Sequence, residues 1–376
     1  MTTLTHAPRR RALLSRTSAV LVTVGVALST GVATSAAAPL DAGELSSVSG
    51  FLSAQLASGG DHFSTTFDGI DYPDHGLSAD AVLALNAIGA GRAQADATTA
   101  YLQQNVGGYI GAGGETYAGA TGKLLVVAAS QGVPPTSFGG VDLVARLDST
   151  LTPSGRFSDV SEWGDYSNTL GQSWAIIGLS RVDRGPAASA VDFLRDQQCQ
   201  DGGFRLDLGG TTPCVSDPDA TAMAVQALVA ASDRTDPDVA EAVAYLGDRM
   251  GADGGVGGAG PTSAPNGNST GLAAAAFAAA GDTARAGRAR SFLGSLFFGC
   301  DSPAALRGGI AYDAAALAAT ESSDQVRRTT AQAAVGLSGQ SYVTVSAAGN
   351  AAAPGALDCA GAGGPSGTGS LGSLGL

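Results

Sequence analysis

The chain has 376 residues, of which 44% are hydrophobic and only 6% aromatic, so its core must consist largely of Ala, Val and Leu. This length allows one large domain or two ordinary ones. Its 20 basic and 33 acidic residues give a formal net charge of −13, which excludes nucleic acid and anionic lipid as favourable partners because both are themselves negative.

The first 38 residues have the composition of a secretory signal peptide. Four arginines precede an apolar run over Ala19–Leu28 that is too short to span a bilayer, and small residues follow at Ala36–Ala38. We expect export by a Sec or a twin-arginine route; the alternative, a buried N-terminal helix, must accommodate four arginines and no acid. Removal of this segment leaves 16 basic and 33 acidic residues, a net charge of −17. No later stretch predicts a transmembrane anchor, and we expect a secreted or envelope-associated monomer.

Two sequence markers recur about every fifty residues. One is a bulky apolar pair within an amphipathic helical pattern, beginning at positions 51, 101, 143, 193, 245 and 292. The other is a glycine turn closed by an apolar residue, beginning at positions 60, 107, 155, 202, 254 and 308. Two independent markers with one period indicate six structural repeats.

A helical pattern that is apolar nearly all round follows each glycine turn, which is typical of a buried helix. We expect these inner helices over 78–89, 117–130, 167–180, 219–231, 269–281 and 327–339. The helices with the bulky pairs carry charge on one face, so we place them outside. One repeat cannot bury its own apolar surface. The pattern predicts an all-α fold over 39–342, an α/α toroid of six helix pairs in two concentric layers; an open solenoid is the alternative. The one short strand candidate is 341–346.

Four cysteines favour two disulfides in an exported chain. Cys199 and Cys214 would close a short loop, and Cys300 with Cys359 would tie the C-terminal tail to the body. A zinc site is the weaker interpretation because the chain has no CxxC motif, and the histidines that follow the signal segment are distant in sequence from any cysteine. We predict no metal and no cofactor.

The stretch LRDQQCQDGGF (194–204) resembles the glutamine–glycine–aromatic repeat of squalene and terpene cyclases, and LQQNVGGY (102–109) is a looser copy. The resemblance covers residues 43–340 and extends to the β-subunits of protein prenyltransferases. It implies an α/α toroid. It leaves the activity open, because related toroids include cyclases, prenyltransferases, cobalamin carriers and thioester domains.

The acid motif of the cyclases, Asp-x-Asp-Asp-Thr-Ala, corresponds here to Asp217-Pro-Asp219-Ala-Thr-Ala. The resemblance implies that Asp219 matches the proton donor, while Ala220 replaces the carboxylate that would tune it. Few aromatic residues are available to stabilise a carbocation. The structural alternative is that Asp219 caps the following helix and Asp217 adds favourable charge near its N-terminus.

The other enzymatic interpretations rest on different residues. The helix that would supply the zinc-binding histidine of a prenyltransferase (324–339) has none, and the Cys-Gly-Glu-Gln run of thioester domains is absent. A carbohydrate-active barrel needs two carboxyl groups across a cleft. Two acidic loops before inner helices are candidates for this role or for calcium binding, and they contain Asp71, Asp74, His75, Asp159, Glu162, Trp163 and Asp165. Ordinary solvated loops and caps are the alternative.

The interpretation that we favour is a non-catalytic toroid that binds an apolar or polycyclic ligand, or an envelope component, in its central funnel. The ligand-binding candidates are Tyr117, Tyr166, Asn168, Gln172, Trp174, Asp219, Gln226 and Asn268. Trp174 can equally be a core residue. Residues 343–376 are rich in Gly and Ser and predict a flexible tail.

Overall fold

Pairs of outer and inner helices build the described part of the computed structural model, which comprises residues 38–182, 184–210 and 212–360. The inner helices are α2 (His75–Ile88), α5 (Ala118–Gln131), α7 (Thr169–Ser180), α9 (Pro218–Ala231), α11 (Gly267–Ala280) and α13 (Asp324–Leu337). The outer helices are α1 (Ala42–Ser58), α3 (Arg92–Gln104), α6 (Leu143–Asp148), α8 (Ala188–Arg195), α10 (Pro237–Asp248) and α12 (Thr283–Ser295). The predicted signal segment lies outside the described residues.

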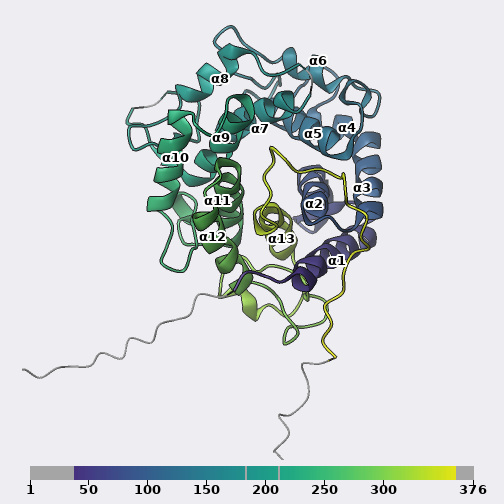
Figure 1. Cartoon of the computed structure of the whole chain (residues 1–376). Coiled ribbons are helices and arrows are strands. Elements are labelled where there is room, and N and C mark those ends of the chain that lie inside the picture. The colour runs from purple at the N-terminus through teal and green to yellow at the C-terminus, as the bar shows by residue number, and fades with distance from the viewer. Residues whose placement is uncertain (1–37, 183, 211, 361–376) are drawn as a thin grey trace, which may run out of the picture. The chain divides into compact units, whose positions relative to one another are not determined.

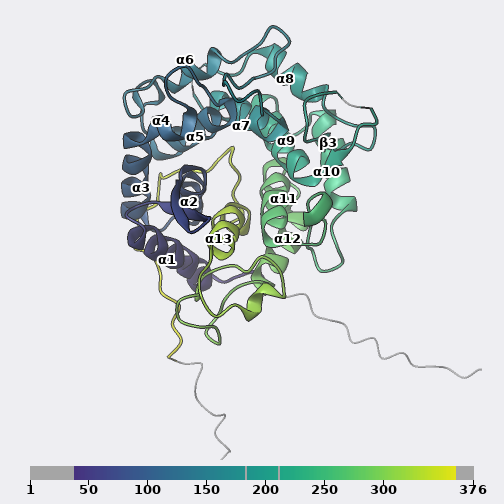
Figure 2. The same cartoon turned by 180° about the vertical axis from the view of Figure 1, so that it is seen from behind.

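The inner helices form a closed ring, because each packs against the next and α13 packs against α2 (Figure 1). The outer helices surround this ring, as the opposite view also shows (Figure 2). The predicted all-α toroid of two concentric layers is therefore confirmed. The open solenoid is excluded because α13 and α2 are in contact.

Small residues let the inner helices approach closely. A Cβ on Gly122 of α5 would lie 2.6 Å from the backbone nitrogen of Ala175 in α7, and one on Gly271 of α11 would lie 2.6 Å from the Cα of Ala333 in α13. Real Cβ atoms do not approach so closely, so larger residues would push the helices apart. The high Ala and Gly content is thus the physical basis of the tight inner ring.

The repeated glycine turns join each repeat to the next outer helix. Gly254 and Gly308 have φ angles of +91° and +88°, and a Cβ on either would lie 2.3 Å from a backbone oxygen, that of Arg288 in α12 or of Ser47 in α1. Glycine is required both by the positive φ and by the close approach. Since Ser47 belongs to the first helix, the contact of Gly308 also helps to close the ring.

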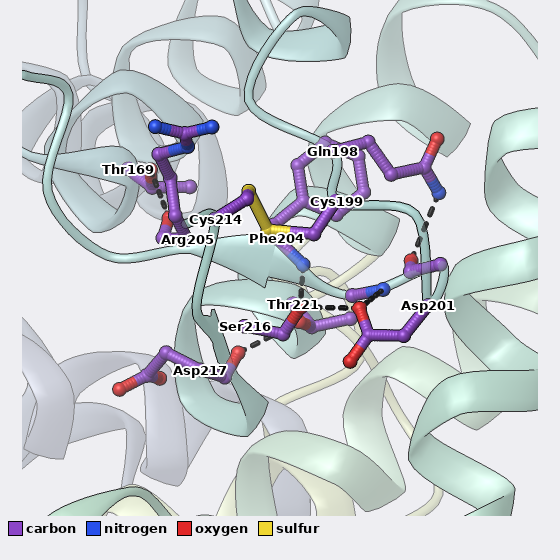
Figure 3. Close-up of a disulfide and its surroundings, with 12 residues drawn as sticks. Thr169, Gln198, Cys199, Asp201, Phe204, Arg205, Cys214, Ser216, Asp217 and Thr221 are labelled. Carbon is purple, nitrogen blue, oxygen red and sulfur yellow. Dashed lines mark hydrogen bonds between the residues drawn. A yellow bond between two sulfur atoms is a disulfide. The ribbon is translucent and has the colours of Figure 1, made fainter. Parts of the chain in front are cut away.

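In five of the six repeats, the backbone N–H of the apolar residue that ends the glycine turn donates to a side chain of its inner helix. The backbone N–H of Phe204 donates to the hydroxyl of Thr221 at 2.8 Å, and that of Val256 donates to Thr270 at 2.9 Å (Figure 3 shows the first). Equivalent bonds in other repeats use Ser78, Gln172 and Thr330. One polar residue near the start of each of these inner helices therefore satisfies a buried N–H group.

Short elements complete the fold and correct two expectations. The turn expected at position 107 is helical, because Gly107 lies within α4 (Val106–Ile110). The loop expected over 67–76 contains most of a hairpin instead. The strands are β1 (Phe63–Phe67) paired antiparallel with β2 (Ile70–Asp74), and β3 (Phe204–Arg205) paired antiparallel with β4 (Ser216–Asp217). The 3₁₀ helices are η1 (Pro135–Ser137), η2 (Gly260–Thr262) and η3 (Ala316–Ala318).

Both predicted disulfides are present, Cys199–Cys214 and Cys300–Cys359. The first joins the segment before β3 to the loop between β3 and β4, just before α9 (Figure 3). None of the described helices is long and apolar enough to cross a membrane.

The segment 341–360, which we call the C-terminal strap, is held against the ring, although a flexible tail was expected from 343. It contains no strand. Backbone bonds join Ala347 to Ser130 at 2.7 Å and Ala352 to Gly91 at 3.0 Å, so the strap crosses the ends of α5 and α2 (Figure 1). Its hydrogen bonds and the disulfide at Cys359 explain why its Gly- and Ala-rich composition does not leave it free. Residues 361–376 lie outside the described residues.

Candidate functional site

The inner helices begin at one end of the ring, which we call the N-terminal rim. First-turn residues of α9, α11 and α13 line one pocket together, and those of α5 and α7 line another. The opposite end is covered by the C-terminal strap, whose Tyr342 is fully buried and accepts through its carbonyl oxygen from Arg181 at the end of α7. Access from solvent to the inner helices is therefore at the N-terminal rim.

The two aspartates before α9 have different roles. Asp217 is the N-cap of α9, and its side chain accepts from the backbone N–H of Ala220 at 2.8 Å. Pro218 occupies the first helical turn, as its missing N–H allows. The expectation that Asp219 is the cap is therefore wrong, because the helix begins one residue earlier than expected and Asp217 occupies the N-cap.

Asp219 faces a pocket of about 510 Å³, which we call the Asp219 pocket. Its side-chain oxygen Oδ1 is buried and has no hydrogen-bond partner. Hydroxyl, amide and charged side chains line the pocket, among them Asn268, Ser269, Tyr312, Asp324 and Arg328. No aliphatic side chain lines it. The pocket can therefore offer hydrogen bonds to a polar ligand, and the carbon atoms of the same side chains supply the larger part of its exposed surface.

Burial raises the pKa of Asp219 to about 6, against a smaller opposing effect of the Ser269 hydroxyl, and the nearby Asp217 carboxylate adds to the rise. Burial, together with the charge of Asp219, also raises the pKa of Tyr312. A carboxyl that titrates near neutral pH can accept a hydrogen bond or donate a proton, depending on pH.

A buried polar network forms the floor between the inner helices. Lys123 of α5 donates to Asp80 of α2 at 2.6 Å, and Gln332 of α13 donates to the other oxygen of Asp80 at 3.2 Å. Asn268 of α11 donates to Gln332 and accepts from Thr329. Asp80 is only 3% exposed. The network links four neighbouring helices of the inner ring, α5, α2, α13 and α11, so buried polar side chains join these helices at this depth.

A second pocket of about 420 Å³ lies over α5 and α7, and we call it the Trp174 pocket. Aromatic side chains dominate its lining: Tyr109, Tyr117, Tyr166 and Trp174. Lys123, Asp159 and Asn168 add polar groups. Lys123 Nζ lies 5.1 Å from the centre of the Trp174 ring, and this ring also packs against Tyr342 of the strap. Trp174 is therefore partly a core residue and partly a pocket wall.

Six of the eight predicted ligand-binding residues line these two pockets. Asp219 and Asn268 line the first, and Tyr117, Tyr166, Asn168 and Trp174 line the second. Asn168 is also the N-cap of α7, and Tyr117 donates to Glu115 at 2.5 Å.

The other two predicted residues are fully buried and lie outside the pockets. Gln172 bonds to Gly155 and Ala190 at 2.9 and 3.0 Å, so it joins α7 to its outer layer. Gln226 accepts from the backbone N–H of Tyr342 at 2.9 Å, so it holds the strap. Both side chains satisfy backbone groups of the protein itself, which explains why they are unavailable to a ligand.

The acidic loop over 67–76 is largely satisfied by its own protein. Asp71 accepts from Thr66 at 2.6 Å, and Asp74 caps α2 and pairs with Arg328 at 2.6 Å. His75 stacks against Tyr101 and Tyr109. These contacts favour the interpretation of this loop as an ordinary helix cap and loop connection over a catalytic or calcium-binding role.

The loop over 157–168 is more open. Trp163 is 72% exposed, and Glu162 is exposed beside it. Asp165 pairs with Arg156 at 2.8 Å. Burial raises the pKa of Asp159, although the backbone N–H of Ala118 donates to its carboxylate. Within 38–182, 184–210 and 212–360, no group of three or more His, Cys, Asp or Glu side chains could hold a metal ion.

Sequence reasoning missed Lys123, Ser269, Tyr312, Asp324 and Arg328 as pocket residues. Lys123 is the one charged residue in the apolar stretch 118–131, which is a usable signal. Tyr312 lies in an irregular loop, so no helical period indicates its position.

No protein-family model matches this chain, and no curated protein matches it. A solved structure of a protein from Actinoplanes is similar with a TM-score of 0.57 at 17% identity, covering 81% of this chain and 100% of that one. The type II terpene cyclase MstE from Scytonema is similar with a TM-score of 0.53 at 16% identity, covering 78% and 98%. An unsaturated glucuronyl hydrolase specific for heparin has a TM-score of 0.55 at 12% identity, covering 79% and 96%.

At these identities the likeness concerns the fold, which this chain shares with toroids of both kinds. Membership of the terpene-cyclase repeat family remains a prediction.

Replacing Asp219 with asparagine should stabilise the protein above pH 6 by about 3 kcal/mol. The folded-state pKa of about 6 lies above the ordinary value of 3.8, so the native protein loses stability relative to the variant as pH rises between these values. Below about pH 4 the difference should vanish. Urea unfolding at pH 4, 6 and 8 measures it.

The matched control is Asp217→Asn, because asparagine is an equally good N-cap. This variant should remain within about 0.5 kcal/mol of the native protein at pH 8. Equal stabilisation by both substitutions would contradict the assignment of Asp219 as the carboxyl whose pKa is raised by burial.

Proposed function

We propose that this protein is exported and binds a hydroxyl-bearing polar ligand at the N-terminal rim, without transforming it. Asp219 Oδ1 carries the proposal, because it is buried at the edge of a pocket and lacks a hydrogen-bond partner. An unsatisfied buried acceptor costs about 1–3 kcal/mol. A ligand hydroxyl that donates to it would remove this cost, which makes Asp219 a favourable contact.

The lining of the pocket favours this ligand class over the apolar or polycyclic ligand suggested by the sequence. Asn268 and Tyr312 offer further hydrogen bonds, and Arg328 adds a charged group. Export is supported by the composition of residues 1–38 and by the two disulfides, which persist in oxidising compartments. The ligand would then come from the medium or the cell envelope. We propose that the protein binds it as a monomer.

Calorimetric titration at pH 7 with polyols and mono- and oligosaccharides, and with squalene as the apolar comparator, tests the proposal. We expect a polar ligand to bind, and Asp219→Asn to weaken it about tenfold because a charge-assisted hydrogen bond is lost. Asp217→Asn should leave the affinity unchanged, since that residue only caps α9. Binding of squalene alone, or an affinity insensitive to Asp219→Asn, would contradict the proposal.

Acid-base cleavage of a glycoside is the second candidate. Asp219 and Asp324 line the same pocket, and two carboxyl groups at one site are what such hydrolysis requires. Chromatography of the same saccharides after long incubation distinguishes the candidates. Product formed by the native protein and abolished in Asp219→Asn would establish an enzyme, whereas retention of intact ligand supports binding.

Polyprene cyclisation with Asp219 as the acid is less well supported. Tyr312 is the one aromatic residue in the lining of the Asp219 pocket, and a carbocation needs more π-surface than one ring provides.

A further inference from the structure

Side chains that line the two pockets of the N-terminal rim both contact the start of α2. On one side, Asp74, the N-cap of this helix, pairs with Arg328, which lines the Asp219 pocket. On the other side, the carbonyl oxygen of Gly76 accepts from Lys123, which lines the Trp174 pocket, at 3.4 Å. Lining residues of both pockets therefore meet the start of α2 two residues apart in sequence.

The same pockets are joined below by the polar floor. Lys123 reaches Asn268 of the Asp219 pocket through only two intermediate side chains, Asp80 and Gln332. Since this path consists of three hydrogen bonds, the pockets lie within reach of a single ligand that is a few rings long.

The walls of the two pockets differ in a way that suits a sugar chain. The Asp219 pocket provides hydrogen-bonding groups throughout its lining. The Trp174 pocket instead provides aromatic faces, and the Tyr166 side chain among them is 74% exposed and so accessible to a ligand. An aromatic face packs against the C–H face of a pyranose, while Asn168 and Asp159 can bond its hydroxyl groups.

Charge at the rim selects against acidic ligands. Asp159, Glu162, Asp219 and Asp324 lie in or beside the pockets. The cations that line the two pockets, Lys123 and Arg328, are already paired with Asp80 and Asp74, each at 2.6 Å. A negatively charged glycan would therefore meet repulsion from the carboxylates, and both lining cations are already neutralised by a protein partner.

We propose that the two pockets are subsites for one neutral oligosaccharide, with one sugar bonded at Asp219 and a later sugar stacked at Tyr166. This inference rests on the proposed function of the Asp219 pocket and adds a second subsite, a minimum ligand length and a ligand charge. Monosaccharides occupy one subsite only, so affinity depends on chain length.

Calorimetric titration of the full mature chain at pH 7 with gluco-, manno- and N-acetylglucosamine oligomers of one to six units tests the inference, with oligogalacturonates as acidic comparators. For one neutral series we expect the affinity to increase at least tenfold between one and four units. Oligogalacturonates should bind at least tenfold more weakly than neutral chains of equal length.

Tyr166→Ala should remove the gain with chain length and leave monosaccharide affinity unchanged. Trp163→Ala is the matched control, since this aromatic residue of the same loop is 72% exposed and lies outside the pocket lining. It should leave all affinities unchanged. Both residues are exposed, so neither variant should fail to fold.

The outcomes separate the inference from the proposed function. Affinity that depends on Asp219 but is insensitive to chain length or to Tyr166→Ala overturns the second subsite alone. Preference for oligogalacturonates overturns the neutral ligand. Binding of none of the oligomers overturns the inference, whereas binding insensitive to Asp219→Asn overturns the proposed function itself.

Discussion

Lys123→Met is expected to reduce the free energy of unfolding by about 3–5 kcal/mol, because it leaves a buried carboxylate without its cation. Lys123 pairs with Asp80 at 2.6 Å, and their side chains are only 13% and 4% exposed. Burial by itself would lower the pKa of Lys123. The nearby negative charges, among which Asp80 has the largest effect, outweigh burial and raise this pKa above its ordinary value. Urea unfolding at pH 7 measures the loss.

Two controls identify the buried charge as the cause. The double variant Lys123→Met/Asp80→Asn removes both charges and should recover most of the lost stability. Arg184→Met breaks the exposed pair with Asp148, in which the arginine side chain is 49% exposed, and should cost about 0–1 kcal/mol. If Lys123→Met alone is as stable as the double variant, the Asp80 carboxylate does not need Lys123 to compensate its buried charge.

Removing the Cys300–Cys359 disulfide by serine substitution at both positions should cost about 4 kcal/mol, because the bridge closes a long loop in the unfolded chain. The two cysteines are 59 residues apart in sequence. The bridge also anchors the C-terminal strap, so its loss should expose the ends of α2 and α5. Urea unfolding measures the stability, and hydrogen exchange of Ala347 and Gly91 measures the release of the strap.

The other disulfide is the matched comparison. Cys199 and Cys214 are 15 residues apart, for which the same relation gives about 3 kcal/mol. Its removal should leave exchange in the strap unchanged. The account is contradicted if the shorter loop gives the larger loss, or if removal of Cys300–Cys359 leaves strap exchange at its native rate.

Much of the fold was predictable because the sequence repeats the same pattern of glycine and apolar residues about every fifty residues. The glycine turns at 155, 202, 254 and 308 mark positions where a positive φ and a close backbone approach allow no side chain. The apolar inner helices follow from their lack of a polar face. The incorrect predictions concern short segments: α4 lies where a turn was expected, and a hairpin occupies most of 67–76. The conformation of such short segments depends on tertiary contacts with neighbouring elements.

The site was less predictable because side-chain direction depends on one residue of register. Gln172 and Gln226 lie on inner helices, as predicted, yet both face backbone groups of the protein. Tyr312 lies in a loop without a helical period, and its place at the rim follows only from how the ring closes.

By itself, the sequence determined the toroid, its six repeats and the cysteine pairs, because periodicity, glycine placement and cysteine number act through local geometry and chain entropy. Only the tertiary structure decided which aspartate caps α9 and which faces a pocket. In the structure, the Asp217 carboxylate accepts from the backbone N–H of Ala220 at the start of α9, whereas Asp219 Oδ1 is buried without a hydrogen-bond partner. The two residues are alike in sequence, and burial against α11 and α13 makes the difference between a cap and a binding group.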